Sequence, residues 1–240
     1  MQNQEKKHFH NIGAKVLAFA AALALMPALL LSCVAWRVMD DLPYFEQEYT
    51  KYAVPETVHM DMTELLRVTE HMMAYLGGET DSLQIEAQID GVQTPFFSEK
   101  EIRHMVDVQE LFAKGTILRN VCFVFFVLVA VGLLFSHKTE ILLRQLRWGI
   151  VVFFALALAF LGLILTDFNR YFTIFHLIFF DNQDWILDPS VDRLINLVPL
   201  GFFFDTVLWI VGVFVACNVV LFVGASLLLR RFGKKQIQQS

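Results

Sequence analysis

Two histidines occupy positions from which an imidazole could do chemistry. His104 lies in a stretch with helical periodicity, and Asp107 follows three residues later on the same face. His176 lies in a run of aromatic and aliphatic residues, where a polar ring needs a bonding partner or a chemical role. An imidazole, with an ordinary pKa near 6.5, can accept and return a proton close to neutral pH. The two rings are therefore a candidate acid–base pair. The alternative is a pair of structural histidines that are hydrogen-bonded across a small folded cap.

The composition places this pair in a membrane protein. Hydrophobic residues make up 56% of the 240 residues and charged residues 18%, and the mean hydropathy is +0.54. Soluble domains are about half apolar and a quarter charged. Four segments have roughly the 20 apolar residues that a membrane-spanning helix needs. They are residues 16–36, 118–136, 148–166 and 206–229. The sequence predicts an integral membrane α-helical protein, and its net charge of −5 disfavours nucleic acid as a partner.

The charges between these segments predict how the chain crosses the cell membrane. The two connections at residues 37–117 and 167–205 are acidic, whereas both termini and the connection between the second and third spans are basic. Residues 37–118 hold 16 acidic and 6 basic residues, and residues 167–205 hold 6 and 2. Since basic loops stay in the cytoplasm, we expect a multi-pass protein with both termini cytoplasmic. His104 and His176 then lie on the extracytoplasmic side, near the membrane surface where lipid esters are found.

The first acidic connection has enough local signals to fold as a small α+β cap. Residues 61–64 and 98–101 both have the spacing of a capping box, and Gly77-Gly78 ends the helix that the first box begins. Alternating apolar residues from Leu83 lead to Asp90-Gly91, the strongest short hairpin signal. The second box begins a helix that carries His104 and runs into the second span.

The second acidic connection is too apolar for a solvated loop and too polar for a fifth span. Residues 167–180 suit a helix at the membrane interface, where aromatic rings are common. Asp188 then resembles an N-cap with Pro189 at the first helical position. We expect a short helix over residues 191–197 that ends before Pro199. The single membrane domain thus carries an extracytoplasmic cap at 37–117 and 167–205.

The first span also resembles a lipoprotein signal that ends at Cys33. A basic start, an apolar stretch and Leu-Leu-Ser-Cys over residues 30–33 would fit cleavage there, which would leave three spans. The apolar stretch continues to Trp36, as it would in an uncleaved anchor. All three cysteines fall inside spans, so they form neither a disulfide framework nor a thiolate metal site.

Two motifs around the histidines resemble a known family. One is Ser-Glu-Lys-Glu-Ile-Arg-His-Met-Val-Asp-Val over residues 98–108. The other is Tyr-Phe-Thr-Ile-Phe-His-Leu-Ile-Phe-Phe over residues 171–180, followed by Trp185, Asp188-Pro189, Leu194-Ile195 and Pro199. A weaker third ends at Tyr75-Leu76-Gly77. Together they are similar to a bacterial four-helix membrane family that includes the lipoprotein intramolecular transacylases of Gram-positive bacteria. The resemblance runs from the first span to the fourth.

The resemblance implies a definite reaction and site. The substrate would be a diacylglyceryl-modified lipoprotein, held in membrane lipid, whose sn-2 acyl chain moves to the α-amino group of the N-terminal cysteine and gives the lyso form. The family's two catalytic histidines match His104 and His176. Such a reaction needs no cofactor and no metal. Asp107 could orient His104, and three further side chains could contact the polar part of the substrate: Arg170, Tyr171 and Arg193.

Two other function classes remain open on the residues alone. One is a metal-dependent membrane hydrolase of lipid or peptide bonds, with His104, Asp107 and His176 as ligands, which stoichiometric zinc in the purified protein would indicate. The other is a non-catalytic membrane sensor whose cap binds a partner. Such a protein would tolerate alanine at both histidines.

Overall fold

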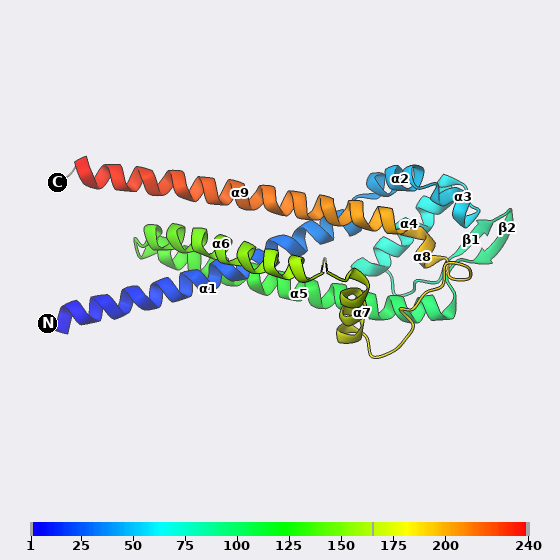
Figure 1. Ribbon diagram of the computed structural model, residues 1–240, viewed down its shortest axis with the longest axis horizontal. Helices are drawn as coiled ribbons and strands as arrows, with labels where there is room; N and C mark the ends of the chain where they lie inside the picture. Colours follow the sequence, from blue (N-terminus) through cyan, green and yellow to red (C-terminus); the bar gives the residue numbers. More distant parts are fainter. Residues whose placement is uncertain (1, 165, 239–240) are drawn as a thin grey trace. The chain divides into compact units, whose positions relative to one another are not determined.

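The computed structural model describes the backbone of residues 2–164 and 166–238 and the side chains of residues 11–163 and 166–233. The chain divides into two compact units. The first, here the membrane unit, comprises Met1–Ser32, Ile117–Asp167 and Gly212–Ser240. The second, here the cap unit, comprises Cys33–Thr116 and Phe168–Val211. Figure 1 shows the order of the elements along the chain.

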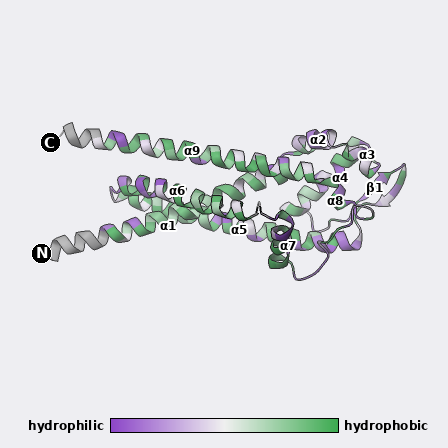
Figure 2. Cartoon of the chain, viewed as in Figure 1, coloured by the Kyte–Doolittle hydropathy of each residue, from purple (hydrophilic) through white to green (hydrophobic). Residues whose placement is uncertain are grey.

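Four long helices cover most of each of the four predicted apolar segments, and the predicted class of membrane protein is confirmed. They are α1 (Gln2–Met39), α5 (Glu99–Phe135), α6 (Thr139–Ile164) and α9 (Leu200–Gln238). Each is long and apolar enough to cross a membrane. In three of them no more than 17% of the most apolar window is buried. Figure 2 shows hydrophobic residues along most of α6 and α9. Apolar surface of this extent requires lipid around it.

Small residues let two helices of the membrane unit approach closely. A Cβ added to Gly149 on α6 would lie 2.7 Å from the Cβ of Ala22 on α1. Ala18 and Ala21, also on α1, are fully buried against Val129 and other apolar residues. In lipid there is little hydrophobic force between helices, so close contact between small residues supplies much of the packing energy.

The cap unit is built from short elements around one apolar core. Its complete elements are α2 (Leu42–Lys51), α3 (Val54–Val58), α4 (Met62–Gly77), β1 (Glu86–Ile89), β2 (Val92–Pro95), α7 (Phe168–Phe179) and α8 (Leu194–Leu197). The first part of α5 and the start of α9 join them. Tyr49, Leu65, Phe96, Leu197 and Phe202 are almost completely buried in this core.

The local signals predicted in the cap are present with some changes. The Asp61 Oδ1 accepts the Glu64 N–H at 2.9 Å and so caps α4. The Glu64 carboxylate bonds Arg67 and the Gln88 N–H instead of completing the box, and the Arg67 guanidinium lowers its pKa to about 2. Gly78, at φ +76°, ends α4. The antiparallel pair β1–β2 turns at Asp90-Gly91, although β1 begins at Glu86 and is shorter than the alternation suggested.

One expectation for the cap is corrected, and two of its helices, α2 and α3, were not predicted. The helix expected from Asp188-Pro189 begins only at Leu194, because the Asp188 Oδ1 accepts the Ser190 N–H and hydroxyl and closes a turn rather than capping a helix. The predicted end before Pro199 is correct, since α8 ends at Leu197.

Candidate active site

His104 is positioned by the first turn of α5. A reciprocal pair of bonds forms that turn: the Ser98 N–H donates to Glu101 Oε2 at 2.7 Å, and the Glu101 N–H donates to Ser98 Oγ at 3.3 Å. The Glu101 carboxylate also accepts the Leu194 N–H at 2.6 Å and is 1% exposed. The predicted capping box therefore fixes both the start of the helix and its contact with α8.

His176 lies near the end of α7 (Phe168–Phe179), and its ring has a defined orientation. Its Nδ1 is 2.8 Å from the Phe172 carbonyl oxygen. Since a carbonyl only accepts, Nδ1 carries the proton and Nε2 is left for other contacts. The ring also stacks on Trp185, with ring centroids 4.6 Å apart and an angle of 28° between planes. The hydrogen bond and the stacking contact together orient the imidazole.

Both imidazoles pack against the same aromatic ring. The centroid of the Phe180 ring is 5.4 Å from that of His104 and 5.5 Å from that of His176. Phe180 is 5% exposed, whereas both histidines are half-buried. The predicted pair is therefore brought together in one partly desolvated place, although the histidines are far apart in the sequence.

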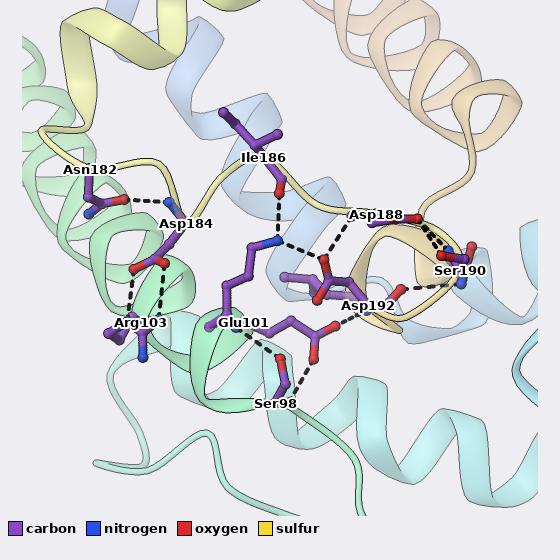
Figure 3. A network of polar contacts seen from close by, with 12 residues as sticks. Ser98, Glu101, Arg103, Asn182, Asp184, Ile186, Asp188, Ser190 and Asp192 are labelled. Atoms are coloured by element: carbon purple, nitrogen blue, oxygen red, sulfur yellow. Dashed lines mark hydrogen bonds and ion pairs between the residues drawn. The ribbon is translucent and has the colours of Figure 1, made fainter.

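Polar contacts tie the segment after α7 to the exposed side of α5 (Figure 3). Arg103 makes two bonds to the Asp184 carboxylate, at 2.9 and 3.1 Å. The Lys100 ammonium donates to the Ile186 carbonyl at 2.6 Å and to Asp192 at 2.9 Å. Bidentate pairs between a guanidinium and a carboxylate fix orientation as well as distance. They hold the loop whose Trp185 ring covers His176.

Asp107 belongs to the same set of contacts rather than to His104. Its Oδ2 accepts the side-chain amide of Asn182 at 2.7 Å. The side-chain oxygen of Asn182 in turn accepts the Asp184 N–H at 2.9 Å. The backbone carbonyl of Asn182 accepts the Trp185 indole N–H at 3.0 Å. The carboxylate acts on His104 through its charge.

The surroundings of His104 disfavour its charged form. Burial lowers its pKa from 6.5, and a positive charge on His176 lowers it further, while Asp107 and Asp184 act in the opposite direction. His104 precedes the apolar segment of α5, so these groups lie outside the predicted span. Its Nδ1 is buried and has no hydrogen-bond partner among the described residues. An imidazolium would need a partner there.

The remaining predicted residues lie at varying distances from this pair. Arg193 donates to the Pro95 and Phe96 carbonyls, at 3.1 and 3.0 Å, and so joins the start of α8 to the hairpin. Arg170 is exposed and Tyr171 half-buried, both on α7. In the part of the chain that the structure describes, no hydrogen bond joins Tyr171 or Arg193 to either histidine.

Sequence reasoning missed the residues that fix the site. These are Lys100, Arg103, Asn182, Asp184 and Asp192. The two cations are three residues apart on one helical face, and the acids cluster after residue 180. The opposite charges of these two groups were the signal in the sequence from which their contacts could have been predicted. As for metal ligands, no three His, Cys, Asp or Glu residues gather into a metal-holding group within the described ranges, so His104, Asp107 and His176 do not form the ligand set of the alternative reading.

The four apolar helices define a multi-pass membrane protein, and the histidine pair in its cap is the candidate active site. The family model of the lipoprotein intramolecular transacylase Lit matches residues 19–203. The chain belongs to this family, which confirms the resemblance predicted from the histidine motifs. It is an acyltransferase that moves an acyl chain within a lipoprotein. This assignment replaces both alternative functions, the metal-dependent hydrolase and the non-catalytic sensor.

Solved structures of a relative from Bacillus cereus, a Gram-positive bacterium, have the same fold. The chain is similar to the membrane integral lipoprotein intramolecular transacylase Lit in a variant with one histidine replaced by arginine, at a TM-score of 0.75 and 19% identity, over 99% of this chain and 100% of that one. A variant of the same protein with alanine in place of a histidine gives 0.77 and 18%, over 98% and 100%. No curated protein matches the sequence.

Proposed function

We propose that His104 and His176 together catalyse the acyl transfer, which converts a diacylglyceryl lipoprotein to its lyso form. The observation that carries the proposal is the packing of both imidazoles on Phe180, within a cap whose loop is fixed by the Arg103–Asp184 pair. The substrate supplies both its own nucleophile and its own ester. The protein therefore has to position the two and to move protons.

The chemistry requires one base and one acid. The α-amino nitrogen attacks the sn-2 ester carbon, the new C–N bond forms, and the C–O bond to glycerol breaks. An α-amino group has a pKa of about 7.7–8.0, so its attack at neutral pH requires loss of a proton. The lowered pKa of His104 suits it to accept that proton. In its doubly protonated form, His176, whose Nδ1–H is bound to a carbonyl, delivers its Nε2 proton to the glycerol oxygen as the C–O bond breaks. Proton exchange with water then returns His104 to its neutral form and His176 to its protonated form.

Two single substitutions test this assignment. Each of His104→Ala and His176→Ala should lower the rate of conversion about 100-fold or more, the typical contribution of a positioned acid or base. The measurement is mass spectrometry of N-terminal lipopeptides from a host that makes only the diacylglyceryl form. The matched control is His59→Asn, since His59 is an exposed cap histidine at φ +58°, a conformation that asparagine tolerates.

The possible results separate the site from the family assignment. Conversion by the parent chain and by His59→Asn, lost in both alanine variants, would support the pair. Full conversion by either alanine variant at equal expression would remove that histidine from the mechanism while leaving the activity in place.

We also propose that the cap unit faces the outside of the cell membrane and that both termini are cytoplasmic. The acidic connections at 37–117 and 167–205 and the basic segments elsewhere support this orientation. The diacylglyceryl substrate would then reach the site from the outer leaflet of the membrane lipid. Arg170, Tyr171 and Arg193 are proposed contacts for its polar region, since they lie on α7 or just before α8.

A further inference from the structure

The membrane unit contains a basic cavity that the acyl transfer does not use. It has a volume of about 540 Å³ and lies between α6 and the last part of α9. Arg147 and Arg230 line it together with Phe222, Val223, Ser226 and Leu227. Pockets of this size are typical of small-ligand sites. Its lining combines two guanidinium groups with apolar side chains.

The two arginines have no acidic partner among the described residues. The Arg147 Nε is buried without a hydrogen-bond partner, and its guanidinium lies 5.0 Å from the centroid of the Phe222 ring. By contrast, Arg144 on the same helix lies 4.0 Å from the Glu140 carboxylate and does not line the cavity. A buried donor without a partner costs free energy unless a ligand supplies the acceptor.

The apolar part of the lining continues onto surface that faces lipid. Val223 and Leu227 are 47% and 53% exposed. They line the cavity about two turns and one turn before Arg230 on α9. A ligand with an anionic head and an apolar tail could therefore place its head between Arg147 and Arg230 and its tail along these side chains. A soluble anion would bind only between the two arginines and would leave the apolar side chains uncovered.

A second hollow lies beside α6 and is lined by residues that neighbour Arg147 in the sequence. It has a volume of about 370 Å³ and is lined by Lys15 on α1 and by Gln145 and Trp148 on α6, with apolar residues between them. Lysine and tryptophan side chains are characteristic of the level at which lipid head groups lie. These residues place the basic cavity at the head-group level as well.

We propose that the cavity between Arg147 and Arg230 binds the phosphate of an anionic phospholipid. The two guanidinium groups donate to the phosphate oxygens, as paired arginines do, and the acyl chains lie against Val223 and Leu227. Basic pockets between membrane helices on the cytoplasmic side are a known means of recognising anionic lipids. The assignment to the cytoplasmic leaflet rests on the proposed topology, whereas the binding itself does not.

Native mass spectrometry of the delipidated full-length protein in detergent tests the proposal. Phosphatidylglycerol should bind at one site, and each of Arg147→Gln and Arg230→Gln should weaken that binding about tenfold, as loss of a charge-assisted hydrogen bond does. The matched control, Arg144→Gln, removes the same charge from the same helix and should change binding less than twofold. Arg230 is exposed, so its substitution tests the site without disturbing the interior.

Three results would overturn the proposal. Equal weakening by Arg144→Gln would show that only the overall surface charge matters. Equal binding of phosphatidylcholine with the same acyl chains would remove the requirement for an anionic lipid. Competition by inorganic phosphate at the same concentration as the lipid would identify a soluble anion as the ligand. None of these results depends on lipoprotein conversion, so the proposed function is tested separately.

Discussion

At the scale of single residues, the two histidines have the same chemistry but different environments. His176 has its Nδ1 fixed on a carbonyl oxygen and its ring stacked on Trp185, whereas the Nδ1 of His104 is buried without a partner. Burial lowers the pKa of His104 from its ordinary value, so this ring is the better candidate for the base.

The pH dependence of the transfer should report this environment. Protonated His104 cannot accept the amine proton, so the rate falls as the pH drops through its pKa. Because burial and His176 lower that pKa, the fall should lie below pH 6.5. Since the Asp107 carboxylate raises the pKa of His104, Asp107→Asn should move the fall to still lower pH. The measurement is the pH profile of kcat/KM with a diacylglyceryl lipopeptide, and a move to higher pH would contradict the assignment.

The sequence was sufficient to find the histidines but not to find what holds them. His104 and His176 were recognisable because each is a polar ring in a setting that does not otherwise require one. The pair Lys100–Asp192 joins residues that are distant in the chain, and no local spacing indicates such a contact. The helical spacing of Asp107 suggests that it could orient His104, but its carboxylate accepts a hydrogen bond from Asn182 instead.

At the scale of elements, Glu101 joins two segments of the cap through backbone donors. Its carboxylate accepts the N–H groups of Ser98 and Leu194, and it is almost fully buried. Glu101→Ala leaves both donors unsatisfied, which should lower the free energy of unfolding by about 2–4 kcal/mol. Glu99→Ala is the matched control, since Glu99 is an exposed acid in the same turn. Denaturation of the purified protein by SDS in mixed micelles measures both, and equal stability of the two variants would refute this role.

Elements with local signals were predictable, and those held by distant contacts were not. Asp61 and Gly78 mark the two ends of α4 within the chain itself. Helix α2 depends on burial of Tyr44 and Tyr49 against Phe202, which comes from the start of α9. Pro43 in its first turn was the one local indication of that helix.

At the scale of the whole molecule, the proposed topology can be tested at two exposed positions. Gln93 lies in the hairpin of the cap unit, and Ser136 lies in the turn between α5 and α6. In intact cells, a membrane-impermeant maleimide should label Gln93→Cys but should label Ser136→Cys only after the membrane is made permeable. The background chain has its three cysteines replaced by serine or alanine. The reverse pattern would place the cap in the cytoplasm.

The exposed surface of helix α7 determines which measure of substrate concentration governs the reaction rate. None of its residues is fully buried, and Leu177, Ile178 and Phe179 are each more than half exposed. We propose that a helix with this surface lies at the membrane interface, where a lipid-anchored substrate approaches it by diffusion in the plane of the membrane. The quantity that determines the rate is then the mole fraction of lipoprotein in the bilayer or micelle. Adding detergent at a fixed bulk amount of enzyme and lipoprotein should therefore slow the reaction by surface dilution alone.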